Sequence, residues 1–113
     1  MNMRITGLLL GAALLAACAT TAPPAASEQE RTEAMIAYMA CLHVNARKLD
    51  DHRSDAATIA IGLRSVCADS FLKSLETYSR QMNPVARRMF MNKAEDSFIR
   101  QATTAVLDER ASR

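Results

Sequence analysis

Two short polar breaks divide the chain beyond residue 27 into three long segments, and this division constrains the fold more than any other feature. The breaks are residues 50–54 (Asp-Asp-His-Arg-Ser) and residues 83–84 (Asn-Pro). Within each segment apolar side chains recur every three to four residues, the spacing of one face of an α-helix. Runs of β-branched residues are absent, which also favours helix. The sequence therefore predicts an all-α fold, a small three-helix bundle with helices at about 28–49, 55–82 and 84–109.

The helix starts carry recognisable caps. Ser27 followed by Glu30 has the spacing of a capping box. Asn83 is a good cap, and the proline after it suits the first helical position, where its missing N–H is not needed. For the middle helix we expect Ser54 to be the cap and Asp55 to lie in the first turn.

Apolar faces predict how the first two helices pack as an antiparallel hairpin. On the first, apolar residues around Cys41 form an arc wide enough for two neighbours, and they include Tyr38, Leu42 and Val44. On the second, the face around Cys67 lies opposite a charged face. The apolar face consists of Ala56, Ile59, Ala60, Leu63, Phe71, Leu75, Tyr78 and Met82, and the charged face of Asp69, Lys73, Glu76 and Arg80.

The third helix has the least regular pattern. One side carries Phe90, Met91, Ala94, Phe98, Ile99, Ala102, Ala105 and Val106. Met89, Val85 and Leu107 point elsewhere, as do Ile36, Ile61 and Leu72 of the first two helices. The wide apolar arc of the first helix, together with Met89 and Leu107, suggests a protein partner or self-association.

The N-terminal residues 1–17 have the form of a secretory signal peptide. Arg4 precedes an apolar run over residues 5–17, which is too short to span a membrane. The run ends Leu-Ala-Ala-Cys at residues 15–18 and resembles the lipobox of bacterial lipoproteins. That resemblance implies that Cys18 is lipidated and becomes the first mature residue, and Ala19 favours the outer membrane. The alternative is a plain cleaved signal peptide in which Cys18 has no role.

Residues 18–27 then form a proline-containing tether between the lipid and a helical domain at 28–113. The 113-residue chain suffices for one small domain. Its formal net charge of +2 does not indicate a nucleic-acid partner.

Cys41 and Cys67 are left as a pair once Cys18 is assigned to lipid. An exported chain with an even number of cysteines favours a disulfide, and both residues fall on the faces assigned to the helical hairpin. Closing this loop should stabilise the fold by about 3 kcal/mol. A metal site or two free buried thiols are the remaining alternatives.

Other chemistry-bearing residues have simpler interpretations. We expect His43 and His52 to be solvated surface residues. Asp50, Asp51 and Asp55 match a turn and cap better than a calcium loop, which needs a glycine and a distal glutamate. Met89 and Met91 suit gap filling better than copper ligation. Arg87 and Arg88, in the first turn of the third helix, conflict with the helix dipole and are candidates for contact with lipid headgroups or an acidic partner. No catalytic, metal or cofactor-binding motif is present.

The stretch from Cys41 to Cys67, with Leu-Asp-Asp at 49–51 and Ser-Asp-Ala-Ala-Thr-Ile at 54–59, resembles small helical proteobacterial proteins with two cysteines and no assigned function. That resemblance supplies no activity. The anchor and the lack of a catalytic pattern lead to the hypothesis of a non-enzymatic structural or accessory protein of the cell envelope. It would be anchored by lipid on the periplasmic side of the outer membrane and would bind a protein partner or self-associate. The alternative is a periplasmic carrier or stress sensor for a metal or a small apolar ligand.

Overall fold

The computed structural model describes residues 23–113, which form four α-helices. They are α1 (Glu28–Leu49), α2 (Ala56–Val66), α3 (Ala68–Ser79) and α4 (Pro84–Ala111). The prediction of an all-α chain is confirmed for this part. The signal peptide, the lipobox and Cys18 lie outside the described residues. Within them, no helix is both long and apolar enough to cross a membrane.

Helix caps explain where three of the four helices begin. The capping box is confirmed: the backbone N–H of Glu30 donates to Ser27 Oγ, and that of Ser27 donates to the Glu30 carboxylate. Asn83 caps α4 as predicted. The prediction that Ser54 caps the next helix is wrong, because Asp55 accepts from the backbone N–H of Thr58. Ser54 lies in the preceding turn, where its N–H and hydroxyl both donate to Asp51.

The expected single helix at 55–82 is wrong in one respect, since it is broken at Cys67. This residue ends α2 and precedes α3, with φ −103° and ψ 14° instead of helical values. No proline or glycine marks the break, and its cause is tertiary. α2 packs mainly on α4 and α1, whereas α3 packs mainly on α1. The bundle therefore contains four helices where three were expected.

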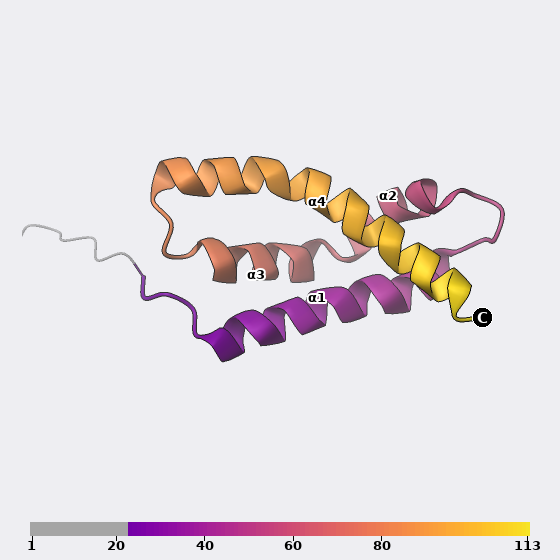
Figure 1. Cartoon of the computed structure of the whole chain (residues 1–113), viewed down its shortest axis with the longest axis horizontal. Helices are drawn as coiled ribbons and strands as arrows, with labels where there is room; N and C mark the ends of the chain where they lie inside the picture. Colours follow the sequence, from indigo (N-terminus) through magenta and orange to yellow (C-terminus); the bar gives the residue numbers. More distant parts are fainter. Residues whose placement is uncertain (1–22) are drawn as a thin grey trace, which may run out of the picture.

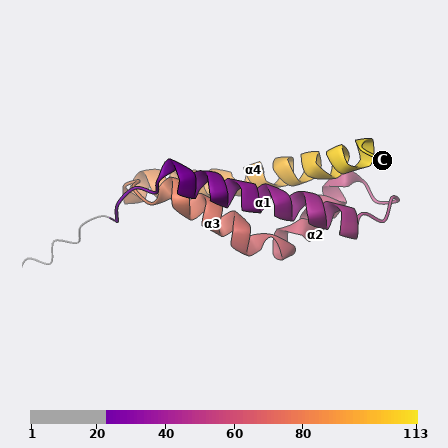
Figure 2. The same ribbon diagram turned by 90° about the horizontal axis from the view of Figure 1, so that it is seen from below.

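α2 and α3 together run back along α1, and α4 then returns in the direction of α1 (Figure 1). Figure 2 shows α1 lying against α3 and then α2, as the contacts between these helices also indicate. α4 packs closely on α2 and α1 but has few contacts with α3. This uneven packing determines where the bundle is left unfilled.

The centre of the core is a group of three aromatic rings from three helices. Tyr38, Phe71 and Phe98 are buried, with ring centroids 5.0–6.1 Å apart. The guanidinium of Arg64 lies 5.3 Å from the centroids of both phenylalanines and pairs with Glu95. These contacts join all four helices at the level of the break.

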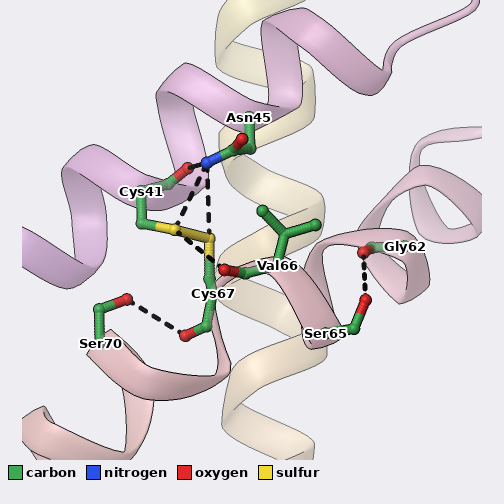
Figure 3. The surroundings of a disulfide bond; sticks show 7 residues. All are labelled: Cys41, Asn45, Gly62, Ser65, Val66, Cys67 and Ser70. Carbon is green, nitrogen blue, oxygen red and sulfur yellow. Dashed lines mark hydrogen bonds between the residues drawn. A yellow bond between two sulfur atoms is a disulfide. The ribbon is translucent and has the colours of Figure 1, made fainter.

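A disulfide joins Cys41 on α1 to Cys67 at the break, as predicted, with the Cα atoms 5.8 Å apart (Figure 3). Cys67 is fully buried and Cys41 half-buried. The side-chain amide of Asn45 donates to the Cys41 carbonyl and lies 3.5 Å from its sulfur. α3 begins after Cys67 without a side-chain cap.

The stray apolar residues are exposed, as the helical projections predict. Their exposed fractions run from 49% to 70%, and they are Ile36, Ile61, Leu72, Val85, Met89 and Leu107. Three residues expected in the interfaces are instead about 40% exposed, namely Val44, Tyr78 and Ile99. Tyr78 lies at the end of α3, which has few contacts with α4, and its neighbours Thr77 and Ser79 are buried instead. The charged face of α3 also differs, since Arg80 reaches Glu30 on α1 as well as Glu76.

A buried carboxylate joins the turn after α1 to the last turns of α4. The side chain of Asp50 is 1% exposed and accepts two hydrogen bonds from Arg110 on α4, at 2.7 and 3.0 Å. Arg110 also donates to the carbonyl of Ser54. The guanidinium holds the pKa of Asp50 far below its usual range, and backbone N–H donors lower the pKa of Asp51 to about 2. These bonds hold the turn at residues 50–54 against α4, and we call them the Asp50–Arg110 clamp. They agree with the interpretation of these aspartates as structural.

Acid is expected to weaken this clamp. A carboxylate with a lowered pKa in the folded state stabilises that state fully above its unfolded pKa of about 4, and the contribution is lost as the pH falls below it. Thermal unfolding of the full chain should therefore show a falling Tm between about pH 4 and pH 2. Arg110→Gln should lower the Tm at pH 7 and flatten this pH dependence. The control Arg88→Gln removes the same charge from an exposed position of α4, and it should change neither the Tm at pH 7 nor its pH dependence. Equal effects of the two variants would refute the stabilising role of the Asp50–Arg110 pair.

Candidate functional site

The residues singled out from the sequence do not converge on one site. The disulfide lies in the middle of the bundle, whereas Arg87 and Arg88 are exposed at the start of α4. His43 is half-buried and bonds Glu109 at 3.0 Å, so the expectation of a solvated side chain is wrong for it. His52 is exposed in the turn, as expected. Over residues 23–113, no group of three or more histidine, cysteine or acidic side chains is placed to hold a metal ion.

A cavity of about 340 Å³ that is open to solvent on one side lies between α1, α3 and α4. It occupies the region where α4 and α3 have few contacts. Its lining residues come from all three helices and are Met35, Tyr38, Phe71, Ser74, Leu75, Tyr78, Phe90, Lys93, Ala94, Ser97, Arg100 and Gln101.

Small side chains leave the space that larger ones would fill. Ser74 on α3 and Ala94 and Ser97 on α4 line the cavity at positions next to buried aromatic residues. The hydroxyl of Ser74 donates to the carbonyl of Phe71, one turn earlier in its own helix, at 2.8 Å. Its hydrogen-bonding capacity as a donor is thus satisfied within α3, so this residue adds little polarity to the cavity.

The walls are mainly apolar and aromatic. Met35, Leu75 and Phe90 contribute from α1, α3 and α4 respectively. Both tyrosines of the chain, Tyr38 and Tyr78, also line the cavity. Such a surface can bury an apolar molecule, and its aromatic rings provide large contact areas.

Tyr38 has an unusual environment among the lining residues. It is 1% exposed, and its hydroxyl has no hydrogen-bond partner among the described residues. Burial raises its pKa to about 12, so the phenol stays neutral at ordinary pH. A buried hydroxyl without a partner costs about 1–3 kcal/mol of stability. An unsatisfied polar group beside a cavity is the kind of local exception that functional sites show.

Replacing Tyr38 by phenylalanine is expected to raise the free energy of unfolding by about 1 kcal/mol, because it removes a buried hydroxyl without a partner and keeps the ring packing. Thermal or urea unfolding of the full chain measures this change. Tyr78→Phe is the matched control and should change stability by less than about 0.5 kcal/mol, because Tyr78 is exposed. Destabilisation by Tyr38→Phe would mean that the hydroxyl has a partner in solution.

Two cations lie at the open side of the cavity. Lys93 and Arg100 are both exposed and stand seven residues apart, on the same face of α4. Neither makes an ion pair within residues 23–113. The residues that line the cavity thus include two cations and no carboxylate.

Comparison with protein-family models, with curated proteins and with solved structures found no match to this chain. The interpretation of the site therefore depends on its geometry. Sequence reasoning placed Tyr38, Phe90 and Ala94 on inward faces but gave no cavity. The sequence feature that could have indicated the cavity is the pair Ser74 and Ser97, which are small polar residues near apolar positions on two helices.

Proposed function

We propose that this chain is a membrane-tethered helical domain of the cell envelope that binds a small apolar molecule between α1, α3 and α4. The cavity of about 340 Å³ is the observation that carries the proposal. Of the two sequence-based hypotheses, this is the carrier, in its apolar-ligand form. The accessory protein with a protein partner becomes the second candidate.

The size and lining of the cavity support binding of a small molecule. Ligand sites in proteins are typically about 300–1,000 Å³, mostly apolar, with a few polar groups that fix orientation. This cavity is at the small end of that range. It suits a compact aromatic molecule or one alkyl chain better than a two-chain lipid.

The proposal also includes the lipid anchor expected at Cys18. Lipid on Cys18 and a tether over residues 18–27 would hold the binding domain close to the membrane on its periplasmic side, with the outer membrane as the favoured location. Its ligand could then exchange between the membrane and the domain over a short distance. The disulfide fits a chain exported to an oxidising compartment.

A protein partner or self-association remains the second candidate, and the exposed apolar residues favour it. On α4, Val85, Met89 and Leu107 are 52–70% exposed and fall within one narrow sector of the helix. Arg87 and Arg88 lie in the first turns of the same helix, where contact with an acidic partner stays a prediction. Sedimentation of the chain alone tests self-association.

A neutral apolar dye tests the main proposal. N-phenyl-1-naphthylamine should bind the full chain carrying Cys18→Ser, which cannot be lipidated, with a Kd of about 1–100 µM. Because the chain has no tryptophan and both of its tyrosines line the cavity, tyrosine emission should change with the same binding curve. A dye signal without any change in tyrosine emission would place the dye elsewhere, and no binding at 1 mM protein would refute the proposal.

A further inference from the structure

We infer that the ligand is a single-chain amphiphile with an anionic head group, the alkyl chain lying in the cavity and the head at Lys93 and Arg100. This inference rests on the proposed function and adds the chemical class of the ligand. It comes from the combination of an apolar cavity with two cations at its opening, because an anionic head group can contact these cations whereas a neutral head group gains no charge pairing and a cationic one is repelled.

The apolar part of the ligand is indicated by the walls. Met35, Leu75 and Phe90 come from three different helices and enclose the space between them. A flexible alkyl chain can adapt to the irregular space that such side chains leave. Each methylene group buried there should tighten binding about fourfold until the cavity is filled.

The charge of the head group is indicated by the rim. Lys93 and Arg100 contribute two positive charges from one face of α4, with Ser97 between them. Asp96 lies three residues after Lys93 and four before Arg100, but it does not line the cavity and makes no ion pair with either cation in the described residues, while Glu95 is engaged by Arg64. An Arg side chain can bind a carboxylate or a phosphate through two parallel hydrogen bonds, and a lysine adds a mobile point charge.

The opening is exposed, so the preference for an anion should be moderate. Solvated ion pairs contribute little each, and two of them correspond to about a fivefold gain in affinity. The same exposure makes that gain sensitive to salt, because added ions screen charges that water already surrounds. The alkyl chain thus supplies most of the affinity and the two cations supply the selectivity.

Calorimetric titration of the full chain carrying Cys18→Ser tests the inference with four ten-carbon probes. These are decanoate, decyl phosphate, 1-decanol and decylammonium. We expect decanoate or decyl phosphate to bind about fivefold more tightly than decanol at low salt, and decylammonium to bind most weakly. Comparison of the two anions shows whether the site favours a carboxylate, as in a free fatty acid, or a phosphate, as in a lipid head group.

The double substitution Lys93→Gln and Arg100→Gln should reduce the preference for the anion over decanol to less than twofold while decanol binding is retained. Lys48→Gln with Arg53→Gln is the matched control, because it also removes one lysine and one arginine from exposed positions outside the cavity and should keep the preference. Equal binding of decanol and both anions to the unsubstituted chain would overturn the inference and leave the proposed function standing. Tightest binding of decylammonium would also overturn it, and no binding of any probe would refute the proposed function itself.

Discussion

Reduction of the Cys41–Cys67 disulfide should lower the free energy of unfolding by about 3 kcal/mol, because the bond closes a loop between residues 26 apart and restricts the unfolded chain. For a domain of this size, such a loss corresponds to a fall in Tm on the order of 10–20 °C. Thermal unfolding of the full chain with and without a phosphine reductant measures it. The effect is large because small domains have only about 5–15 kcal/mol of total stability.

The double variant Cys41→Ala and Cys67→Ala is the control for the reductant. Its Tm should lie near that of the reduced chain and should not respond to the phosphine. Cys18→Ser should leave the reductant effect intact, because Cys18 is not part of this bond. A Tm that changes by less than about 3 °C on reduction would contradict the role assigned to the disulfide.

Ser97→Phe should weaken binding of N-phenyl-1-naphthylamine at least tenfold, because the new ring would take up space in the cavity that the ligand needs. Ser97 is half-buried on α4 and lines the cavity. A loss of tenfold corresponds to about 1.4 kcal/mol of binding free energy. The dye titration used for the parent chain measures the change.

Asn92→Phe provides the matched control for that substitution. Asn92 is exposed on α4 and lies about 140° around the helix from Ser97. It should therefore leave dye affinity within twofold of the parent. The Tm of both variants must be recorded, because overpacking typically costs about 1–3 kcal/mol. Unchanged affinity in a folded Ser97→Phe variant would mean that the dye binds outside the cavity.

Features governed by local chemistry could be predicted from the sequence. Ser27 with Glu30, and Asn83 with the proline after it, mark helix starts through hydrogen bonds within a few residues. The pairing of Cys41 with Cys67 followed from an even count and from two helical faces. In each case the feature depends on residues that are close in sequence or on apolar residues that recur every three to four positions.

Features governed by tertiary packing could not be predicted. In a helical projection the apolar face of residues 55–82 is continuous, and the sequence immediately around Cys67 contains no proline or glycine to mark a break. The helix nevertheless divides there, because α2 and α3 pack on different neighbours. Asp55 and not Ser54 caps α2, and the Ser54 hydroxyl donates to Asp51 instead. Arg110 and Asp50 are 60 residues apart, so their pairing required the fold.

The cavity was beyond sequence reasoning for the same reason. Its existence depends on α4 approaching α2 and α1 more closely than α3, which is a property of the assembled bundle. Ser74 and Ser97 take on meaning only when the two helices that carry them are placed on opposite sides of one space. Lys93 and Arg100 likewise look like ordinary surface cations until the cavity beside them is known.

The most direct test of the central claim is a ¹H–¹⁵N spectrum of the full chain carrying Cys18→Ser, recorded during titration with 1-decanol. If the cavity between α1, α3 and α4 binds the alkyl chain, the largest shifts should occur at Ser74, Ala94 and Ser97. Largest shifts at Ile61 on α2 or at Val85 on α4, whose side chains are exposed, would contradict the claim by placing the probe on the outer surface. A spectrum that does not change up to the solubility limit of decanol would contradict it as well.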